Sequence, residues 1–210
     1  PHRSAVKYPK TALLISDTGN PTAVSVLFIA IPGATAITGL ASTHRGLLIF
    51  TERSVHMAVG SPGDLEPYSV QPVVKGVGCI NSRTVIRGRG LVAWMASDGF
   101  YIYDGSARKI SDDLEDMWQP SGWRPSPMWN LAEQASQAGW PWRIATAQLF
   151  KACGVFDEIG QRFKWSVPVC SPFLHSEESL LQVTLCWYPA TGAWDLWAPL
   201  GLSTFAPTCY

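Results

Sequence analysis

The side chains that most often carry chemistry are few and scattered in this sequence. No two histidines have the i, i+4 spacing of a helical zinc site; the four are His2, His44, His56 and His175. The cysteines are odd in number and form no C-x-x-C pair: Cys79, Cys153, Cys170, Cys186 and Cys209. No nucleophile motif or phosphate-binding loop is present. We therefore expect no catalytic residues, no metal site and no cofactor, and a protein that is not an enzyme.

Four carboxylates gather in one stretch, Ser111–Asp116, which reads SDDLED. Asp112 followed three residues later by Glu115 is typical of a helix cap, and acidic groups suit the positive end of a helix. No histidine or nucleophile stands near them in the sequence, so general acid catalysis is disfavoured. We interpret this stretch as the start of a short helix.

The strongest structural signal is Arg89–Gly105, RGLVAWMASDGFYIYDG. Two apolar runs, Leu91–Ala96 and Phe100–Tyr103, flank a Ser-Asp-Gly turn, and Asp-Gly between apolar runs predicts a hairpin. Neither run alternates apolar with polar residues, so we expect both faces of the hairpin to be covered. The predicted structural turn residues are Asp98, Gly99, Asp104 and Gly105, with a glycine at positive φ in at least one pair.

A similar stretch of sequence occurs 44 positions earlier. Arg45–Gly60, RGLLIFTERSVHMAVG, aligns with Arg89–Asp104 without a gap, which makes Leu47–Phe50 the expected equivalent of Leu91–Trp94. Buried hairpins at such a period favour β-propeller blades. We expect an all-β fold, a β-propeller-like array of three to four blades that either closes within one chain or is completed by partners or further chain. The alternative is a β-sandwich with two ordinary hairpins.

Domain organisation follows from the same patterns. Residues 1–34 form an N-terminal arm with the first strands, and residues 35–210 form the propeller-like domain. Further strands are expected at Tyr68–Val74, at Ser82–Ile86 and within Ile144–Val155, with Arg87–Gly90 as a turn. The uncharged run Ala23–Leu40 is nearly long enough to span a bilayer, but its central Pro-Gly favours two strands around a turn. No contact with a membrane is expected.

Residues 118–142 form a Trp- and Pro-rich insertion that suits neither a regular strand nor one long helix. Trp123, Trp129 and Trp140 are our candidates for contacts with a neighbouring subunit, because large apolar patches mark contact sites. The alternative is a lid that packs on the domain itself.

Charge excludes some partners. Sixteen Lys and Arg balance sixteen Asp and Glu, which argues against a strongly basic nucleic-acid surface. Arginines do cluster near aromatic residues in the central hairpin, as in a groove for single-stranded nucleic acid. Those aromatics lie in strands predicted to be buried on both faces, so core packing is the preferred interpretation.

Several motifs resemble one family. They are a strand ending in FTE, a Gly-Cys followed by S-x-x-V, the S-D-G hairpin with its second Asp-Gly, and an Ile-Ser before the acidic helix. The chain resembles the propeller-bearing tail proteins of bacteriophages, in particular the nozzle, tail-hub and DNA-stabilisation proteins of short-tailed phages. The resemblance covers Ile37–Trp118 well and Ala145–Trp197 loosely, where QRFKWSVPV and CWYPATGAWDLW resemble closing blades.

The resemblance implies a non-enzymatic structural virion protein, a nozzle or tail-tube adaptor that lines or caps the DNA channel. It implies a ring of copies of itself, contacts with other tail or portal-proximal proteins, and transient, non-specific passage of DNA at ejection. The protein would be assembled in the bacterial host cytoplasm and reside in the virion. A near-neutral charge suits such a channel, since Lys and Arg contacts to phosphate would hold the DNA. The alternative function is a cellular β-propeller binding module that recruits a protein or a small ligand.

Overall fold

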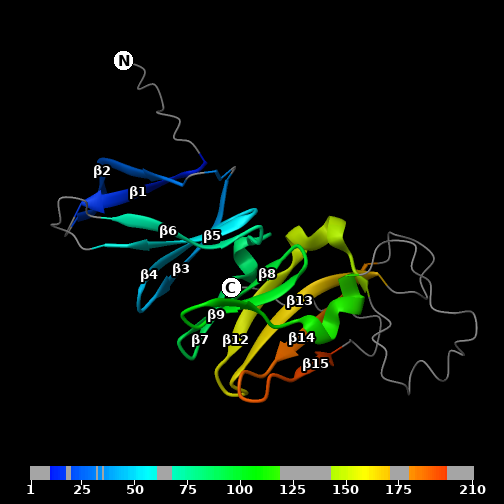
Figure 1. The fold of residues 1–210 in the computed structure, drawn as a ribbon. Coiled ribbons are helices and arrows are strands. Elements are labelled where there is room, and N and C mark those ends of the chain that lie inside the picture. Colours follow the sequence, from blue (N-terminus) through cyan, green and yellow to red (C-terminus); the bar gives the residue numbers. More distant parts are fainter. Residues whose placement is uncertain are drawn as a thin grey trace, which may run out of the picture.

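The computed structural model describes residues 10–17, 20–31, 33–34, 36–60, 68–118, 143–170 and 180–197. Every strand pairing in these residues is antiparallel, so the all-β expectation is confirmed. Residues 1–9 of the predicted N-terminal arm and most of the predicted insertion, residues 119–142, lie outside the described residues. The strands form one hairpin and three larger sheets (Figure 1).

Each larger sheet contains a four-stranded meander in which strands that follow one another in the sequence are neighbours, and the third sheet has a fifth strand. The first meander contains β3 (Ile37–Thr43), β4 (Gly46–Thr51), β5 (Ser54–Val59) and β6 (Ser69–Lys75). The second contains β7 (Ile86–Gly88), β8 (Leu91–Ala96), β9 (Gly99–Tyr103) and β10 (Ala107–Lys109). The third contains β12 (Cys153–Asp157), β13 (Arg162–Cys170), β14 (Leu180–Trp187) and β15 (Trp194–Trp197), and β11 (Arg143–Ile144) pairs with the far end of β13.

The uncharged run near the N-terminus forms two strands around a turn, as predicted. Its first part belongs to β2 (Asn20–Ala30), which pairs with β1 (Ala12–Asp17), and its last part begins β3. Gly33 between them has a φ of 71°, a backbone conformation that favours glycine. Among the described residues, no helix is both long and apolar enough to cross a membrane. The β1–β2 hairpin covers the first meander through a small apolar layer that includes Ile31, Ile49 and Ala58.

The three meanders stack face to face through two apolar layers. Between the first and second meanders lie Leu48, Phe50 and Trp94, among others. Between the second and third lie Phe100, Trp165 and further apolar side chains. Consequently both arms of the β8–β9 hairpin are buried on both faces, as their unbroken apolar sequences predicted.

The structural repeat is 45 residues, so the 44-residue alignment was wrong by one position. β4 and β8 begin at Gly46 and Leu91, and both hairpins turn through two residues. The earlier alignment matched Phe50 with Trp94, but these two rings face each other across the layer, with centroids 5.2 Å apart. A slip of one residue reverses the face of every side chain in a strand. The matching Arg-Gly-Leu sequences therefore differ in position: Arg45 is the second loop residue of its turn, and Arg89 is the first loop residue of its own.

The second and third meanders approach most closely where strands β7 and β12 meet, and glycines make this possible. A Cβ placed on Gly88 would lie 2.3 Å from the Phe156 ring. A Cβ on Gly154 would lie 2.5 Å from the Ile86 side chain. No ordinary side chain fits at either position without moving its neighbour.

Two predicted elements differ in the structure. Ser82–Ile86 is not a strand: Ser82–Thr84 form the 3-10 helix η1, and β7 begins only at Ile86. The Asn81 side chain accepts a hydrogen bond from the Arg83 amide, and the Thr84 hydroxyl donates to the Asn81 carbonyl, so local side-chain bonds replace the strand ladder. The predicted turn Arg87–Gly90 is accordingly reduced to its last two residues.

The acidic stretch forms the predicted short helix, but as the 3-10 helix η2 (Asp112–Trp118). Asp112 is its first residue, so the prediction that it is the N-cap was wrong by one position. The preceding residue, Ser111, uses its hydroxyl to accept the Phe100 amide at 2.9 Å. The predicted strand Ile144–Val155 is also divided, because the 3-10 helix η3 (Thr146–Lys151) separates β11 from β12.

The predicted turn glycines have positive φ. Gly99 has a φ of 154° and Gly105 a φ of 121°. The two loop residues of the β8–β9 hairpin are, however, Ser97 and Asp98, since Gly99 pairs with Ala96 as the first residue of β9. A Cβ on Gly99 would lie 2.3 Å from the Ser111 hydroxyl oxygen and 2.7 Å from Lys109 Cε.

Gly99→Val should destabilise the fold by about 1–3 kcal/mol, because it adds a side chain at positive φ and against Ser111. Gly90→Val is the matched control, since Gly90 has a φ of 76° and no atom within 4 Å of its Cβ position. In urea unfolding, the free energy of unfolding of Gly99→Val should be lower than that of Gly90→Val. Equal losses would show that the crowding at Ser111 is unimportant.

Gly88→Ala should cost about 1–3 kcal/mol through overpacking against Phe156. In the double variant with Phe156→Ala, the added methyl group meets no ring, so its cost should largely disappear. Urea unfolding of the two single variants and the double variant gives the coupling energy. Additive losses would contradict the proposed contact between the two strands.

Candidate interaction surface

The outer face of the third meander carries polar side chains, and the sequence of β13 shows why. Its sequence alternates Arg-Phe-Lys-Trp-Ser-Val, and the apolar members Phe163, Trp165 and Val167 are buried against the second meander. The polar members, Arg162, Lys164 and Ser166, therefore point to the opposite face. Arg162 and Lys164 are half-buried on this face, and Ser166 is buried, where its hydroxyl donates to Gln182.

A connected group of side chains lies at one end of this outer face. We call it the terminal-face cluster, and it consists of Asp157, Arg162, Lys164, Tyr188 and Trp197. Pairing of four strands brings these residues together from β12, β13, β15 and the residue after β14. The cluster is thus assembled by the sheet and not by any local motif.

Asp157 is the anion at the centre of the cluster. Its Oδ2 atom accepts the Arg162 Nε–H at 3.0 Å and lies 2.7 Å from Lys164 Nζ. Its Oδ1 atom accepts the Gly160 amide at 3.0 Å within the β12–β13 turn. The Gly160 amide, then the Lys164 and Arg162 side chains, hold the pKa of Asp157 well below its usual range. The carboxylate is therefore charged at any physiological pH.

Trp197 is the exposed aromatic member, and cations line its ring. The Arg162 guanidinium lies 4.5 Å from the indole centroid and Lys164 Nζ lies 5.1 Å from it. The indole Nε1–H donates to Asp195 at 2.6 Å, and the Arg162 Nη1–H donates to the Tyr188 hydroxyl at 2.7 Å. Trp197 is nevertheless 45% exposed. A tryptophan held in one orientation and still open to solvent is suited to contact another macromolecule.

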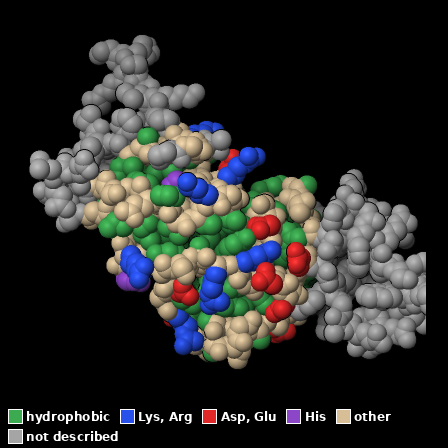
Figure 2. Space-filling view, viewed as in Figure 1, with side chains coloured by type: hydrophobic (Ala, Val, Ile, Leu, Met, Phe, Trp, Pro, Cys, Tyr) green, Lys and Arg blue, Asp and Glu red, His purple; other side chains and the backbone are tan. Residues whose placement is uncertain are grey.

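The face of the molecule drawn in Figure 2 has mixed charge. Figure 2 shows Lys and Arg side chains interspersed with Asp and Glu, and acidic side chains gather on the side where η2 lies in Figure 1. Charges of both signs favour a partner matched by shape and individual pairs, and they disfavour a long-range attraction to polyanions.

The predicted turn residues lie in the second meander, away from the terminal-face cluster. Asp98 accepts the Tyr101 hydroxyl at 2.7 Å, and burial together with this carboxylate raises the pKa of Tyr101. Asp104 accepts the Ser106 amide at 3.3 Å and lies 3.5 Å from Arg108, and the Gly105 carbonyl accepts Arg45 at 3.4 Å. These residues hold turns together. The predicted contact residues Trp123, Trp129 and Trp140 lie outside the described residues.

The structure places one histidine and three cysteines that the sequence analysis named. His56 lies in β5, is 7% exposed, and its Nε2 is 2.9 Å from the Ser54 hydroxyl. Burial, then the nearby Lys75 charge, lowers the pKa of His56. The described cysteines Cys79, Cys153 and Cys186 are buried. Buried thiols of this kind pack as small apolar side chains.

Sequence reasoning missed the terminal-face cluster, although one signal was present. The alternation in β13 contrasts with the unbroken apolar runs of β8 and β9, and it identifies a sheet with one polar face. The contact between Arg162 and Trp197 had no local signal.

No protein-family model and no curated protein matches the chain.

The acid stability of the protein should depend on Asp157. Because its pKa is depressed in the folded state, its stabilising effect is present above the unfolded pKa of about 4 and is lost as the pH falls below that value. Asp157→Asn should therefore lower the melting temperature at pH 7, and the difference from wild type should shrink as the pH falls below about 4.

The control for this experiment is Asp113→Asn, which removes an exposed carboxylate from η2. It should leave the melting temperature near that of wild type over the same pH series. A wild-type curve that stays parallel to the Asp157→Asn curve into acid would contradict the role given to this carboxylate.

Proposed function

We propose that the three meanders are successive blades of an open β-propeller-like array, and that the chain is a structural, non-enzymatic component of a bacteriophage tail. The first two blades repeat with a spacing of 45 residues. Leu48 and Phe50 of the first face the second blade, and residues 93 and 95 of the second face the third. Sheets that cover one another in sequence order are the arrangement of propeller blades. The observation that carries the proposal is this stack, which ends in the terminal-face cluster.

The resemblance to phage tail proteins supports the same function, because its motifs fall at packing positions of the stack. The Phe-Thr-Glu motif ends β4, and the Thr51 carbonyl accepts the Cys79 amide at 2.8 Å. A Cβ on Gly78 would lie 2.1 Å from that same carbonyl oxygen, so the Gly-Cys motif fits closely beneath the β4–β5 turn. The two motifs therefore contact each other where one blade packs against the next.

The polar outer face of the third blade favours assembly between copies over closure within one chain. In a ring closed by a single chain, each blade covers its neighbours with apolar side chains, as the second blade does here. The outer face of the third blade instead presents Arg162, Lys164 and Trp197. We infer a ring of several copies around a channel through which DNA passes, with contacts to other tail or portal-proximal proteins.

Location in a virion is the direct test of this function. Mass spectrometry of purified phage particles from the source of the sequence should detect peptides of this chain. Gold-labelled antibodies against the purified protein should mark the tail in electron micrographs. A chain absent from particles and found instead in uninfected cells would contradict the proposal and favour a cellular binding module.

Association between copies should depend on Trp197. Trp197→Ala should weaken self-association by at least about 2 kcal/mol, or roughly thirtyfold, as expected for a tryptophan at the centre of a contact. Ile159→Ala is the control, since Ile159 is 99% exposed in the neighbouring β12–β13 turn. Sedimentation velocity over a concentration series measures the self-association of both variants. Equal behaviour of the two variants would exclude the terminal-face cluster from the contact between copies.

A further inference from the structure

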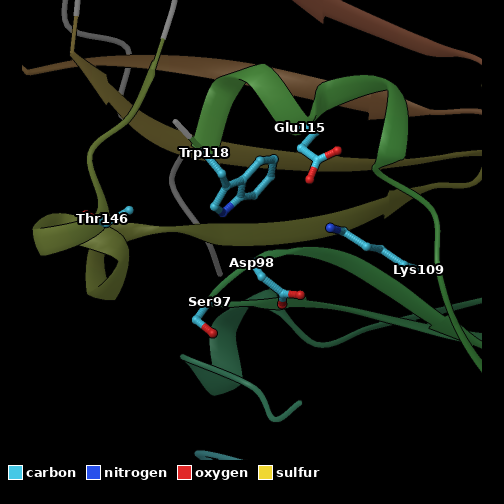
Figure 3. A pocket seen from close by; sticks show the side chains of 6 residues that line it. All are labelled: Ser97, Asp98, Lys109, Glu115, Trp118 and Thr146. Carbon is cyan, nitrogen blue, oxygen red and sulfur yellow. The ribbon is translucent and has the colours of Figure 1, made fainter. Parts of the chain in front are cut away.

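An open pocket lies at the end of the second meander, beyond the β8–β9 turn. It is lined by Ser97, Asp98, Lys109, Glu115, Trp118 and Thr146 and has a volume of about 390 Å³ (Figure 3). These side chains come from four places: the β8–β9 turn, β10, η2 and η3. The volume falls within the usual range for small-molecule sites.

The polar groups of this pocket are largely unoccupied by other parts of the protein. Within the described residues, the Lys109 ammonium and the Glu115 carboxylate form no ion pair, and the hydroxyls of Ser97 and Thr146 form no hydrogen bond. Asp98 uses only Oδ2, as the acceptor of the Tyr101 hydroxyl. Donors and acceptors therefore face one space without satisfying one another.

Gly99 helps to place Lys109 at the pocket. The missing Cβ of Gly99 leaves room for the lysine stem, whose Cε lies 2.7 Å from the position that a Cβ would occupy. Figure 3 shows the Lys109 amine extending from β10 into the space between Asp98 and η2. The same glycine that begins β9 thus permits a cation to lie beside the two carboxylates.

Trp118 supplies the aromatic wall of the pocket. Its ring packs edge-to-face against Phe100, with centroids 5.6 Å apart and an interplanar angle of 84°. Its Nε1–H is enclosed and has no hydrogen-bond partner in the described structure. An enclosed indole N–H without an acceptor is unusual, because such groups are nearly always satisfied. In Figure 3 the nitrogen-bearing edge of the ring is directed toward Asp98 and Thr146.

We propose that this pocket binds a neutral saccharide ring. Sugar hydroxyls both donate and accept hydrogen bonds, so they can satisfy two carboxylates, an ammonium and two hydroxyls together. The apolar face of the sugar ring suits an indole wall. The two carboxylates outnumber the single ammonium, which disfavours phosphate and other anions. The site is separate from the terminal-face cluster, and the inference does not depend on a location in a phage.

The test uses the full chain labelled with ¹⁵N and a panel of uncharged methyl glycosides of glucose, galactose, mannose and N-acetylglucosamine. At least one glycoside should shift the Trp118 indole N–H signal saturably, with a Kd of about 0.1–10 mM. The signal is assigned from its loss in Trp118→Phe. Glu115→Gln and Lys109→Met should each weaken binding by about tenfold, since each removes one charge-assisted hydrogen bond.

Asp113→Asn is the matched control, because Asp113 lies in the same helix as Glu115 but does not line the pocket. It should bind as the wild type does, and the amide spectra of all variants report whether they are folded. The proposal is overturned if no glycoside moves the Trp118 signal up to about 50 mM. It is also overturned if inorganic phosphate binds there more tightly than every glycoside, or if the pocket variants bind like Asp113→Asn.

Discussion

The arrangement of the second and third meanders depends on a small polar contact at η1. The Asn81 amide nitrogen donates to the carbonyls of Phe150 and Ala152, both at 2.9 Å, at the end of η3. The Trp165 indole donates to the Thr84 carbonyl at 3.0 Å. The surrounding layer is apolar, and apolar contacts are not directional. These hydrogen bonds permit one register, since any other leaves buried polar groups without partners.

Both surfaces that we consider functional follow from this register. The bond from Asn81 to η3 holds the wall of the pocket that contains Thr146, opposite η2 and Lys109. The contact through Trp165 turns the apolar side of β13 inward, so Arg162 and Lys164 face outward beside Trp197. The contact at η1 therefore supports the geometry of both surfaces, although its own residues belong to neither.

Local sequence predicted the parts of the fold that local forces determine. The unbroken apolar runs around Asp98 and Gly99 identified the β8–β9 hairpin and its burial, because only a covered sheet accommodates such runs. The strand expected at Ser82–Ile86 failed because Asn81 and Thr84 form side-chain bonds to the backbone that propensity does not reveal. The terminal-face cluster and the pocket were not predictable, since each combines residues from elements far apart in the sequence.

The alternating sequence of β13 also bears on how such a protein could have grown. Duplication of a blade enlarges an array only where the new copy finds an apolar face to rest on. A unit inserted after β15 would meet Lys164 and Asp195, which lie on the outer face on either side of the buried Cys186. A unit inserted between the first and second meanders would meet apolar surfaces on both sides. Growth by duplication is therefore favoured within the stack and disfavoured at this polar face.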